Sequence, residues 1–429
     1  MISEASGRPV IDCYHAPMNT DSFEHRLNAY AELLVKVGVN VQPGQKLLVR
    51  TSTAAVPLTR KIVELAYQAG SPYVEVMWSD DGVTKARFKH APADSFATIP
   101  RYRAEALNQL AAESAASLSI VANDPDMLSG TDPRRFATYQ SAWRPAVKQF
   151  TDLSMSDSIS WCVAAAASPA WARRAFPDLP ESEAVDALWN AIFTATRVYA
   201  ADPVAAWRDH AAGLKVAKDK LNSKRYAALR FTGPGTDLTV GLADGHVWDG
   251  GSSTNKAGTT FMANMPTEEV FTAPHRAKVD GVVRATKPLS YNGNMIDGFW
   301  LRFESGRVVE SHADVGQDAL DSILETDEGS RRLGEVALVP ASSPIEKAGV
   351  LFYETLFDEN AACHIALGRA YNSTVAASQT MDQQRQEAAG MNSSLSHVDF
   401  MIGSAQVDVD GVLADGSTEA VMRRGEWAD

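Results

Sequence analysis

The chain has 429 residues, of which 45% are hydrophobic and 22% are charged, an ordinary composition for a globular protein that folds in water. Its formal net charge of −13 argues against a general nucleic-acid binder and a protein that binds anionic membranes, because both partners attract basic surfaces. No apolar run reaches the roughly 18 residues that a membrane-spanning helix needs, so no membrane contact is expected.

The cysteines and the N-terminus indicate a compartment. The three cysteines, Cys13, Cys162 and Cys363, are widely separated and form no CxxC pair. A disulfide framework or a structural zinc knuckle is therefore not expected, and a reducing cytoplasm suits the chain best. Residues 1–17 lack a basic stretch followed by an apolar core, so we expect no secretory signal.

The first half of the chain alternates helix and strand patterns. Residues 21–37 carry apolar side chains at helical spacing, and Gly38 follows as a stop. A strand within 41–50, a helix over 56–68 and a strand over 73–78 form a βαβ unit, which implies parallel pairing. Further helices are predicted near 103–113, 134–148 and 181–200, and further strands near 116–122 and 158–164. This alternation predicts a doubly wound α/β domain, and the absence of GxGxxG and P-loop patterns gives no sign of a nucleotide site.

The composition changes near residue 225, where short alternating segments joined by Gly, Asp and Asn turns begin. Such a pattern predicts a β-rich α+β domain built on an antiparallel sheet or a partly closed barrel. A helix is expected over 314–324, a strand over 334–340, and a strand–turn–strand unit over 408–427. We place the domain boundary within 200–224, which gives an α/β domain of residues 1–215 and a β-rich domain of residues 216–429.

His397 and Asp399 give the best local signal for a site. On a strand, side chains two apart leave the same face, so an imidazole and a carboxylate would point into one space while Val398 and Phe400 pack behind them. Such a pair is also a common surface or hydrogen-bonded arrangement. His364 and Tyr371, seven residues apart, would share one face of a helix, although Gly368 interrupts the segment.

Acidic residues add to these candidates. Glu268 and Glu269 are adjacent, so on a strand at most one of them points into a given pocket; the pair could equally be solvated at a strand edge. Glu335 begins an apolar strand, where burying an acid without a partner would be costly, or it marks the solvent boundary of that strand.

Together the candidates form a donor set of three carboxylates, two imidazoles and one phenol: Glu269, Glu335, His364, Tyr371, His397 and Asp399. A single catalytic zinc takes about three protein ligands and a water. Six oxygen and nitrogen donors without a thiolate suit two divalent ions that share a bridging group and a water, as in a metallohydrolase.

Three passages, residues 264–274, 363–371 and 396–403, resemble those of the M29 metallo-aminopeptidases of the aminopeptidase T type. The overall layout is similar as well. The resemblance implies a dinuclear metal site with the six donors as ligands, the removal of N-terminal residues from peptides, and a homodimer that encloses its sites. The two ions would be zinc or cobalt, with manganese or magnesium as alternatives.

The chemistry expected from this resemblance is attack of an activated water on the first peptide carbonyl. Tyr371 would help to stabilise the oxyanion if it is not a tight ligand, and Glu268 is the candidate general base. In a straight strand Glu268 would face away from Glu269, so a bulge would be needed. The expected partners are a peptide with a free N-terminus and a second copy of the chain.

Two alternatives remain. The chain could be a dinuclear hydrolase of another bond, such as an amide or a phosphoester, or a metal-binding family member without peptidase turnover. A serine or cysteine mechanism has little support, because the sequence has no GxSxG elbow and Cys363 is more easily explained as a small packing residue.

Overall fold

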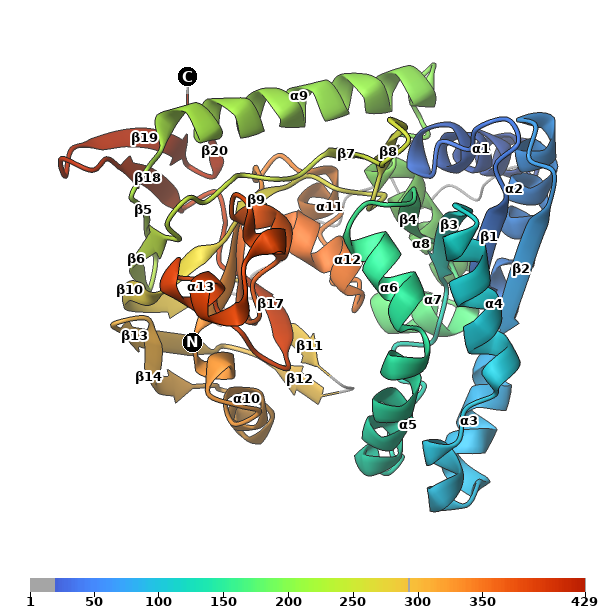
Figure 1. The fold of residues 1–429 in the computed structure, drawn as a ribbon, viewed down its shortest axis with the longest axis horizontal. Helices are drawn as coiled ribbons and strands as arrows, with labels where there is room; N and C mark the ends of the chain where they lie inside the picture. The colour runs from blue at the N-terminus through green and yellow to red at the C-terminus, as the bar shows by residue number, and fades with distance from the viewer. Residues whose placement is uncertain (1–19, 292–293, 429) are drawn as a thin grey trace, which may run out of the picture.

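The computed structural model describes residues 20–291 and 294–428, which form a helical region and a β-rich region side by side (Figure 1). The long helix α9 (Pro203–Lys224) runs along one edge of both regions. Residues 1–17, from which we predicted no secretory signal, lie outside the described residues, and so does Cys13. The other two cysteines, Cys162 and Cys363, are buried and unpaired.

The helical region is built on a four-stranded sheet in the order β2-β1-β3-β4, and all its pairs are parallel. The strands are β1 (Leu47–Ser52), β2 (Val74–Ser79), β3 (Ala116–Val121) and β4 (Trp161–Ala165). The helices of this region are α1 (Thr20–Leu33), α2 (Val56–Gln68), α3 (Asp81–His90), α4 (Arg101–Ala112), α5 (Pro133–Ala146), α6 (Lys148–Met155), α7 (Pro169–Ala175) and α8 (Glu181–Ala195). The predicted parallel α/β arrangement is thus confirmed.

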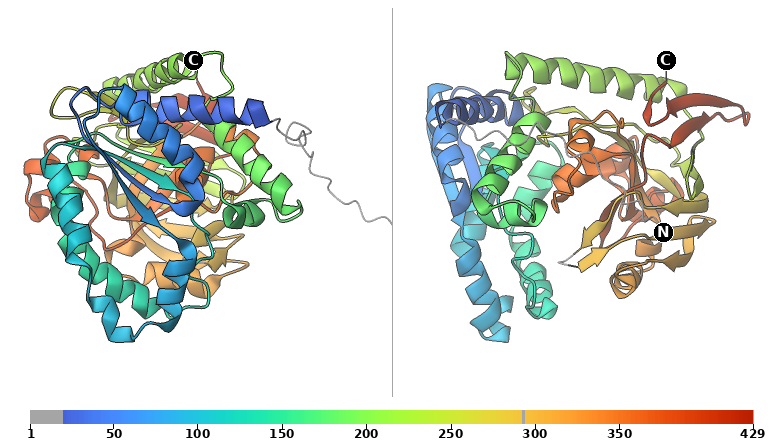
Figure 2. Two further views of the ribbon diagram at one scale, coloured as in Figure 1. Left: turned by 90° about the vertical axis from the view of Figure 1, so that its right-hand side faces the viewer. Right: turned by 180° about the vertical axis from the view of Figure 1, so that it is seen from behind.

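Alternation along β1 explains why helices cover both faces of this sheet (Figure 2, left). Leu47 and Val49 point to one face and share a core with α1, α2 and α8. Leu48, between them, points to the other face and packs with Leu107 of α4 and Phe150 of α6. Strands that are apolar on both faces need cover on both sides, which is what parallel sheets require.

The β-rich region has one eight-stranded and one four-stranded sheet, both antiparallel. The large sheet runs in the order β14 (Arg307–His312), β13 (Trp300–Glu304), β10 (Pro274–Arg284), β6 (Thr236–Leu242), β5 (Ala228–Gly233), β18 (Asp408–Val412), β19 (Thr418–Arg423) and β20 (Glu426–Trp427). The small sheet runs in the order β17 (His397–Met401), β16 (His364–Gly368), β15 (Leu333–Leu338) and β9 (Val270–Thr272). The predicted β-rich second half is confirmed.

Shorter elements complete this region. They are the hairpins β7 (Ser252–Thr254) with β8 (Thr260–Met262) and β11 (Leu289–Tyr291) with β12 (Asn294–Ile296), and the helices α10 (Gln317–Leu324), α11 (Pro344–Lys347), α12 (Thr355–Asp358) and α13 (Gln383–Ala388). One apolar core joins the two sheets, with Val240 and Val279 from the large sheet and Val336, Ile365 and Phe400 from the small one. The small sheet therefore keeps its opposite face free for polar side chains.

The two regions are joined by more than α9. The main chain of β4 continues its pairing into the second half, because Val163 accepts a hydrogen bond from Met265 at 2.9 Å and donates one to Ala263 at 2.8 Å. The predicted boundary segment, 200–224, is mostly helix: α9 starts after Asp202, whose side chain accepts from the Ala205 N–H at 3.0 Å. The division into residues 1–215 and 216–429 stays a prediction. Among the described helices, none combines the length and the apolarity needed to cross a membrane.

Candidate metal centre

The free face of the small sheet gathers the predicted ligands. Across the sheet, Glu335 of β15 lies opposite Ala366 of β16, and Ala366 lies opposite Asp399 of β17. Facing side chains in such a row are about 4.5–5.5 Å apart at Cβ. The small alanine in the middle of the row leaves space between the two carboxylates.

His397 and Asp399 lie on one strand and point to one face, as their spacing predicts, and their role as metal ligands remains a prediction. Both lie on β17 and point to the free face, with His397 Nε2 3.3 Å from Asp399 Oδ1. Val398 and Phe400 alternate with them and are buried in the core between the sheets. The period of two along an extended strand thus places the imidazole and the carboxylate together.

The helical interpretation of the segment from His364 to Tyr371 is wrong. Residues 364–368 form β16, because their main chain is paired with β15 on one side and β17 on the other. His364 points to the free face, and Ile365 points into the core. Gly368 has φ +111°, and beyond it Tyr371 lies in a loop that brings its ring to 4.7 Å from the ring of His397, centroid to centroid.

A β-bulge turns Glu335 toward the site. The register of β15 against β16 shifts between Leu333 and Glu335, so Gly334 is an extra residue and the alternation of faces is reset. Leu333 and Val336 both point into the core, and Glu335 points to the free face. A Cβ at position 334 would lie 2.4 Å from the carbonyl oxygens of Gly368 and Arg369, so only glycine fits there.

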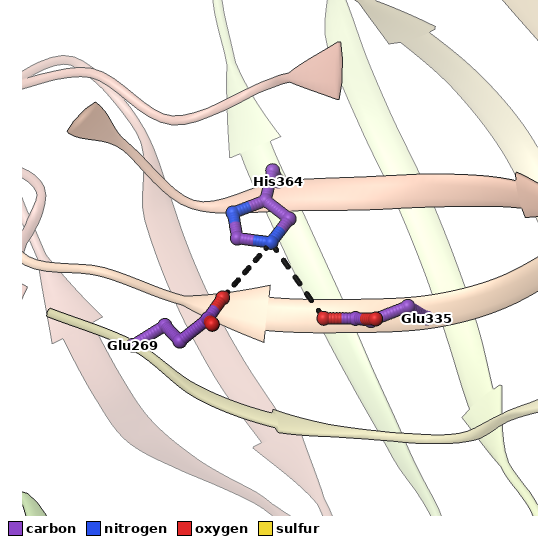
Figure 3. Close-up of side chains that lie close together, drawn as sticks. All are labelled: Glu269, Glu335 and His364. Atoms are coloured by element: carbon purple, nitrogen blue, oxygen red, sulfur yellow. Dashed lines mark ion pairs between the residues drawn. The ribbon is translucent and has the colours of Figure 1, made fainter. Parts of the chain in front are cut away.

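Glu335 belongs to two groups of possible ligand atoms. Glu269, Glu335 and His364 form the first, which we name the Glu269 position; Glu335, His397 and Asp399 form the second, the Asp399 position. Within each group the candidate ligand atoms lie within 4.8 Å of one another. His364 Nε2 is 3.2 Å from Glu269 Oε2 and 3.7 Å from Glu335 Oε1 (Figure 3). The other oxygen, Glu335 Oε2, is 3.3 Å from His397 Nε2.

Backbone carbonyl groups orient both imidazoles. His364 Nδ1 lies 3.2 Å from the Ala362 oxygen, and His397 Nδ1 lies 2.7 Å from the Arg369 oxygen. A carbonyl oxygen only accepts, so both Nδ1 atoms carry hydrogen and both Nε2 atoms face the carboxylates. This is the arrangement in which histidine ligands are held in metalloproteins.

The charges of the site favour cations. Burial raises the pKa of Glu269, and the negative charges of Glu335 and Asp399 raise it further. Burial alone would raise the pKa of Glu335, but hydrogen bonds from His364 and His397 lower it to about 2. Burial opposes the charged form of His397, yet the charge of Asp399 raises the pKa of this imidazole to about 11. The carboxylates thus hold protons on the imidazoles, and a divalent ion would replace those protons.

Glu269 supports this fit independently. Its side chain is buried, and its Oε2 faces the Nε2 of His364 at 3.2 Å. Burying a carboxylate costs several kcal/mol unless hydrogen bonds or a cation compensate, and an ion at this position would supply that compensation. Carboxylates and imidazoles without a thiolate suit zinc, cobalt, manganese and magnesium rather than soft cations.

Glu268 points away from this centre. Its buried carboxylate lies 2.8 Å from Arg197 Nη1 and 3.5 Å from His210 Nε2, and it belongs to neither group of ligand atoms. The opposite directions of Glu268 and Glu269 are those expected of neighbours in an extended segment. The role of Glu268 as general base remains a prediction. The roles of Tyr371 as a metal ligand and as a catalytic residue also remain predictions.

The sequence reasoning missed Glu359. This residue begins a short 3-10 turn after α12, and burial together with the negative charges of Glu269 and Asp399 raises the pKa of its carboxyl well above the usual value. A cavity beside Asp399 is lined by Glu359, Glu354 and Asp358. Burial raises the pKa of Glu354 and of Asp358 to about 7. No spacing rule finds Glu359, because a turn and not a strand brings it to the centre.

Comparison with known proteins agrees with the geometry. Residues 23–427 match the family model described as thermophilic metalloprotease (M29). Aminopeptidase 2 of Geobacillus stearothermophilus is 48% identical over 406 residues, which covers 95% of this chain and 98% of that protein. Aminopeptidase AmpS of Bacillus subtilis is 48% identical over 408 residues, covering 95% and 100%. The solved structure of wild-type AmpT from Thermus thermophilus has a TM-score of 0.89 at 43% identity, covering 95% of this chain and all of that one.

Proposed function

The chain belongs to the M29 metalloprotease family and is a metal-dependent aminopeptidase, and from this premise we propose that it releases N-terminal residues from peptides with two divalent ions. The ions would be held at the Glu269 and Asp399 positions, as zinc or cobalt, with manganese or magnesium as alternatives. The coordination of two ions by this set of side chains is the part that we propose.

One observation carries the proposal: the carboxylate of Glu335 is shared. Its two oxygens face different imidazoles, Oε1 toward His364 and Oε2 toward His397, at 3.7 and 3.3 Å. A carboxylate in this orientation would serve two neighbouring cations, one through each oxygen, and could take part in a centre of the kind found in two-metal hydrolases. A single-ion centre would not need the second imidazole and Asp399.

When bound, two such ions supply a water of lowered pKa as the nucleophile and positive charge for the tetrahedral oxyanion. The residues of the chain do the rest. His364 and His397 present Nε2 to the ions, since their Nδ1 hydrogens are held by backbone carbonyls. Glu269 and Asp399 balance the charge on either side of Glu335.

We propose Tyr371 as a hydrogen-bond donor to the oxyanion. Burial and the negative charges of Glu335 and Asp399 raise the pKa of its phenol well above the usual value, so the hydroxyl keeps its proton. The residue is 37% exposed and its ring lies beside His397, which places it where a substrate can approach the centre. A neutral donor aimed at developing negative charge is a common device in acyl transfer.

Two carboxylates are candidates for moving the proton from water to the leaving amine. Glu268 is the residue predicted from the sequence, and its pairing with Arg197 gives it a fixed orientation. Glu359 is the second, because burial and the charges of Glu269 and Asp399 raise the pKa of its carboxyl, which favours uptake of a proton from water. Replacing each by glutamine separates them: the general base variant keeps both ions and loses turnover.

We propose that the free α-amine of the peptide enters the cavity beside Asp399. Besides Asp399, its lining supplies three carboxyl groups, from Glu354, Asp358 and Glu359, which in their ionised form would attract an ammonium group. A carboxylate within a few ångströms of the amine gives preference for unblocked N-termini. The family resemblance also supports a homodimer, and the buried unpaired Cys162 and Cys363 suit a reducing cytoplasm.

The test combines metal analysis with a matched pair of substrates. Protein purified without chelator should contain two divalent ions per chain by elemental analysis and should hydrolyse aminoacyl amides and short peptides. The same peptides with an acetylated N-terminus are the control and should remain intact. One ion per chain would contradict the dinuclear centre, and equal cleavage of acetylated peptides or preferential phosphoester hydrolysis would contradict the aminopeptidase substrate.

A further inference from the structure

A buried charged cluster lies behind the metal centre and joins the two regions. The guanidinium of Arg197 meets both oxygens of Glu268: Nη1 lies 2.8 Å from Oε1, and Nη2 donates to Oε2 at 3.0 Å. Nη2 also lies 3.0 Å from His210 Nδ1. The Glu268 side chain is 4% exposed and that of Arg197 is 21% exposed. Such a two-pronged pair fixes direction as well as charge.

Arg197 has an unusual backbone conformation. It follows the C-terminal end of α8 with φ +58°, where its N–H donates to the Thr194 oxygen and the next N–H, of Val198, donates to the Phe193 oxygen. This pattern is a Schellman motif, whose left-handed position is normally glycine. An arginine there accepts backbone strain, and from this position its guanidinium reaches Glu268.

The main chain beside Glu268 is held at the same place. The Glu268 N–H donates to Asn360 Oδ1 at 2.7 Å, and the Thr267 oxygen lies 2.8 Å from His210 Nε2. Asn360 is fully buried and directly follows Glu359. Residues 267–268 are therefore fixed through one side chain, one N–H and one carbonyl, and Glu269 is the next residue.

We propose that Arg197 is a positioning residue for the metal ligand Glu269, so that the helical region controls occupancy of the Glu269 position. Glu269 Oε2 contacts the Nε2 of His364, an atom that a bound ion would take over, so the direction of the carboxylate in the loaded site would depend on the fixed backbone before it. The Asp399 position takes its residues from β15 and β17 and none from the segment beside Glu268, so it should not respond. This inference rests on the two-ion centre proposed above and holds whether or not Glu268 also moves a proton.

The experiment uses Arg197→Met in the full chain, with the ions removed and then titrated back as zinc. Calorimetry of the wild type should show two binding events per chain. In the variant, the event assigned to the Glu269 position should weaken by about 10–100-fold, the usual cost of losing a group that orients a metal ligand. The event at the Asp399 position should change by less than about threefold. Arg197→Lys keeps the positive charge but cannot make the two-pronged contact with Glu268, so it should weaken the binding event at the Glu269 position by an intermediate amount.

Arg276→Met is the matched control. Arg276 is 23% exposed and also contacts two oxygens, those of Glu328 and Glu387, at 3.2 Å each. It should bind both zinc ions with wild-type affinity. If Arg197→Met does not fold, the double variant with Glu268→Gln removes both buried charges and provides the folded protein for the same titration.

The outcomes separate the two proposals. One zinc ion per chain in the wild type contradicts the dinuclear centre. Two ions in the wild type with unchanged affinities in a folded Arg197 variant overturn the positioning role alone. Equal weakening of both events also overturns it, because that result indicates a general loss of structure.

Discussion

The two proposed ion positions share Glu335 but differ in how they are built. The Asp399 position takes two of its three residues from one strand, β17, and the side chain of His397 is 15% exposed. The Glu269 position takes its residues from three different segments, and the side chain of His364 is 1% exposed. We call the Asp399 position open, because its histidine is partly exposed and two of its residues are close in sequence. We call the Glu269 position closed, because its histidine is buried and its residues are distant in sequence. The difference indicates that an ion at the closed position would depend on the whole fold, whereas an ion at the open position would depend on a single strand and its neighbour.

Removing Glu335, which both positions share, should weaken ion binding at both of them, and we expect this change to have the largest effect. Glu335→Ala takes a carboxylate oxygen from both positions, so we expect fewer than one ion per chain and a decrease in kcat/KM of at least about a thousandfold. Elemental analysis and hydrolysis of an aminoacyl amide measure the two quantities. Glu346→Ala is the control, because this acid pairs with Lys287 away from the centre. A Glu335 variant with two ions and full turnover would refute the bridging role.

Replacing each histidine should show the asymmetry directly. His364→Ala leaves Glu269 buried beside empty space, which costs about 3–5 kcal/mol of unfolding free energy, as for a broken buried ion pair. His397→Ala affects a more exposed pair with Asp399, so its cost should be smaller. Urea denaturation of the ion-free proteins gives both values. Equal destabilisation by the two substitutions would argue against a closed and an open position.

Tyr371→Phe tests the open side of the centre. The phenol lies beside His397, so its loss should lower kcat by about 10²-fold, the usual effect of removing one oxyanion donor, with both ions retained. Tyr226→Phe, which removes a hydrogen bond to Glu419 and touches neither group of ligand atoms, is the matched control. Loss of an ion in Tyr371→Phe would instead assign this residue as a ligand.

Proton release on metal binding should be the smallest effect. The pKa of His397 is about 11 and that of His364 is raised above 6.5 in the ion-free chain, so at pH 7 the imidazoles hold protons that an ion must displace. Metal affinity should therefore rise with pH by about tenfold per unit for each proton released. The stability that protonated His397 gives the ion-free protein is full below about 6.5 and is lost as pH rises through about 11.

Calorimetry in two buffers of different ionisation enthalpy measures the proton release directly. At least one proton per ion is expected at pH 7. An enthalpy that is the same in both buffers would show that no proton is displaced.

The sequence predicted the local part of the centre well. His397 and Asp399 were found because the period of a strand acts over two residues, and Glu335 because an acid stood out in an apolar strand. The helical interpretation of His364 and Tyr371 failed because a spacing of seven is ambiguous until strand pairing decides it. Glu359 and Arg197 were missed, since a turn and the end of a helix bring them close, and no local period marks such residues.

The register of strand pairing in the small sheet has a consequence for how the enzyme acquires metal ions. A slip of one residue in the pairing of β16 with β17 would turn His397 and Asp399 into the apolar core and bring Val398 and Phe400 out. A misaligned chain would thus be unable to capture its cations. With the proposed ligands, metal uptake would favour chains whose pairing is correct, and added zinc during refolding should raise the yield of native protein by mass action.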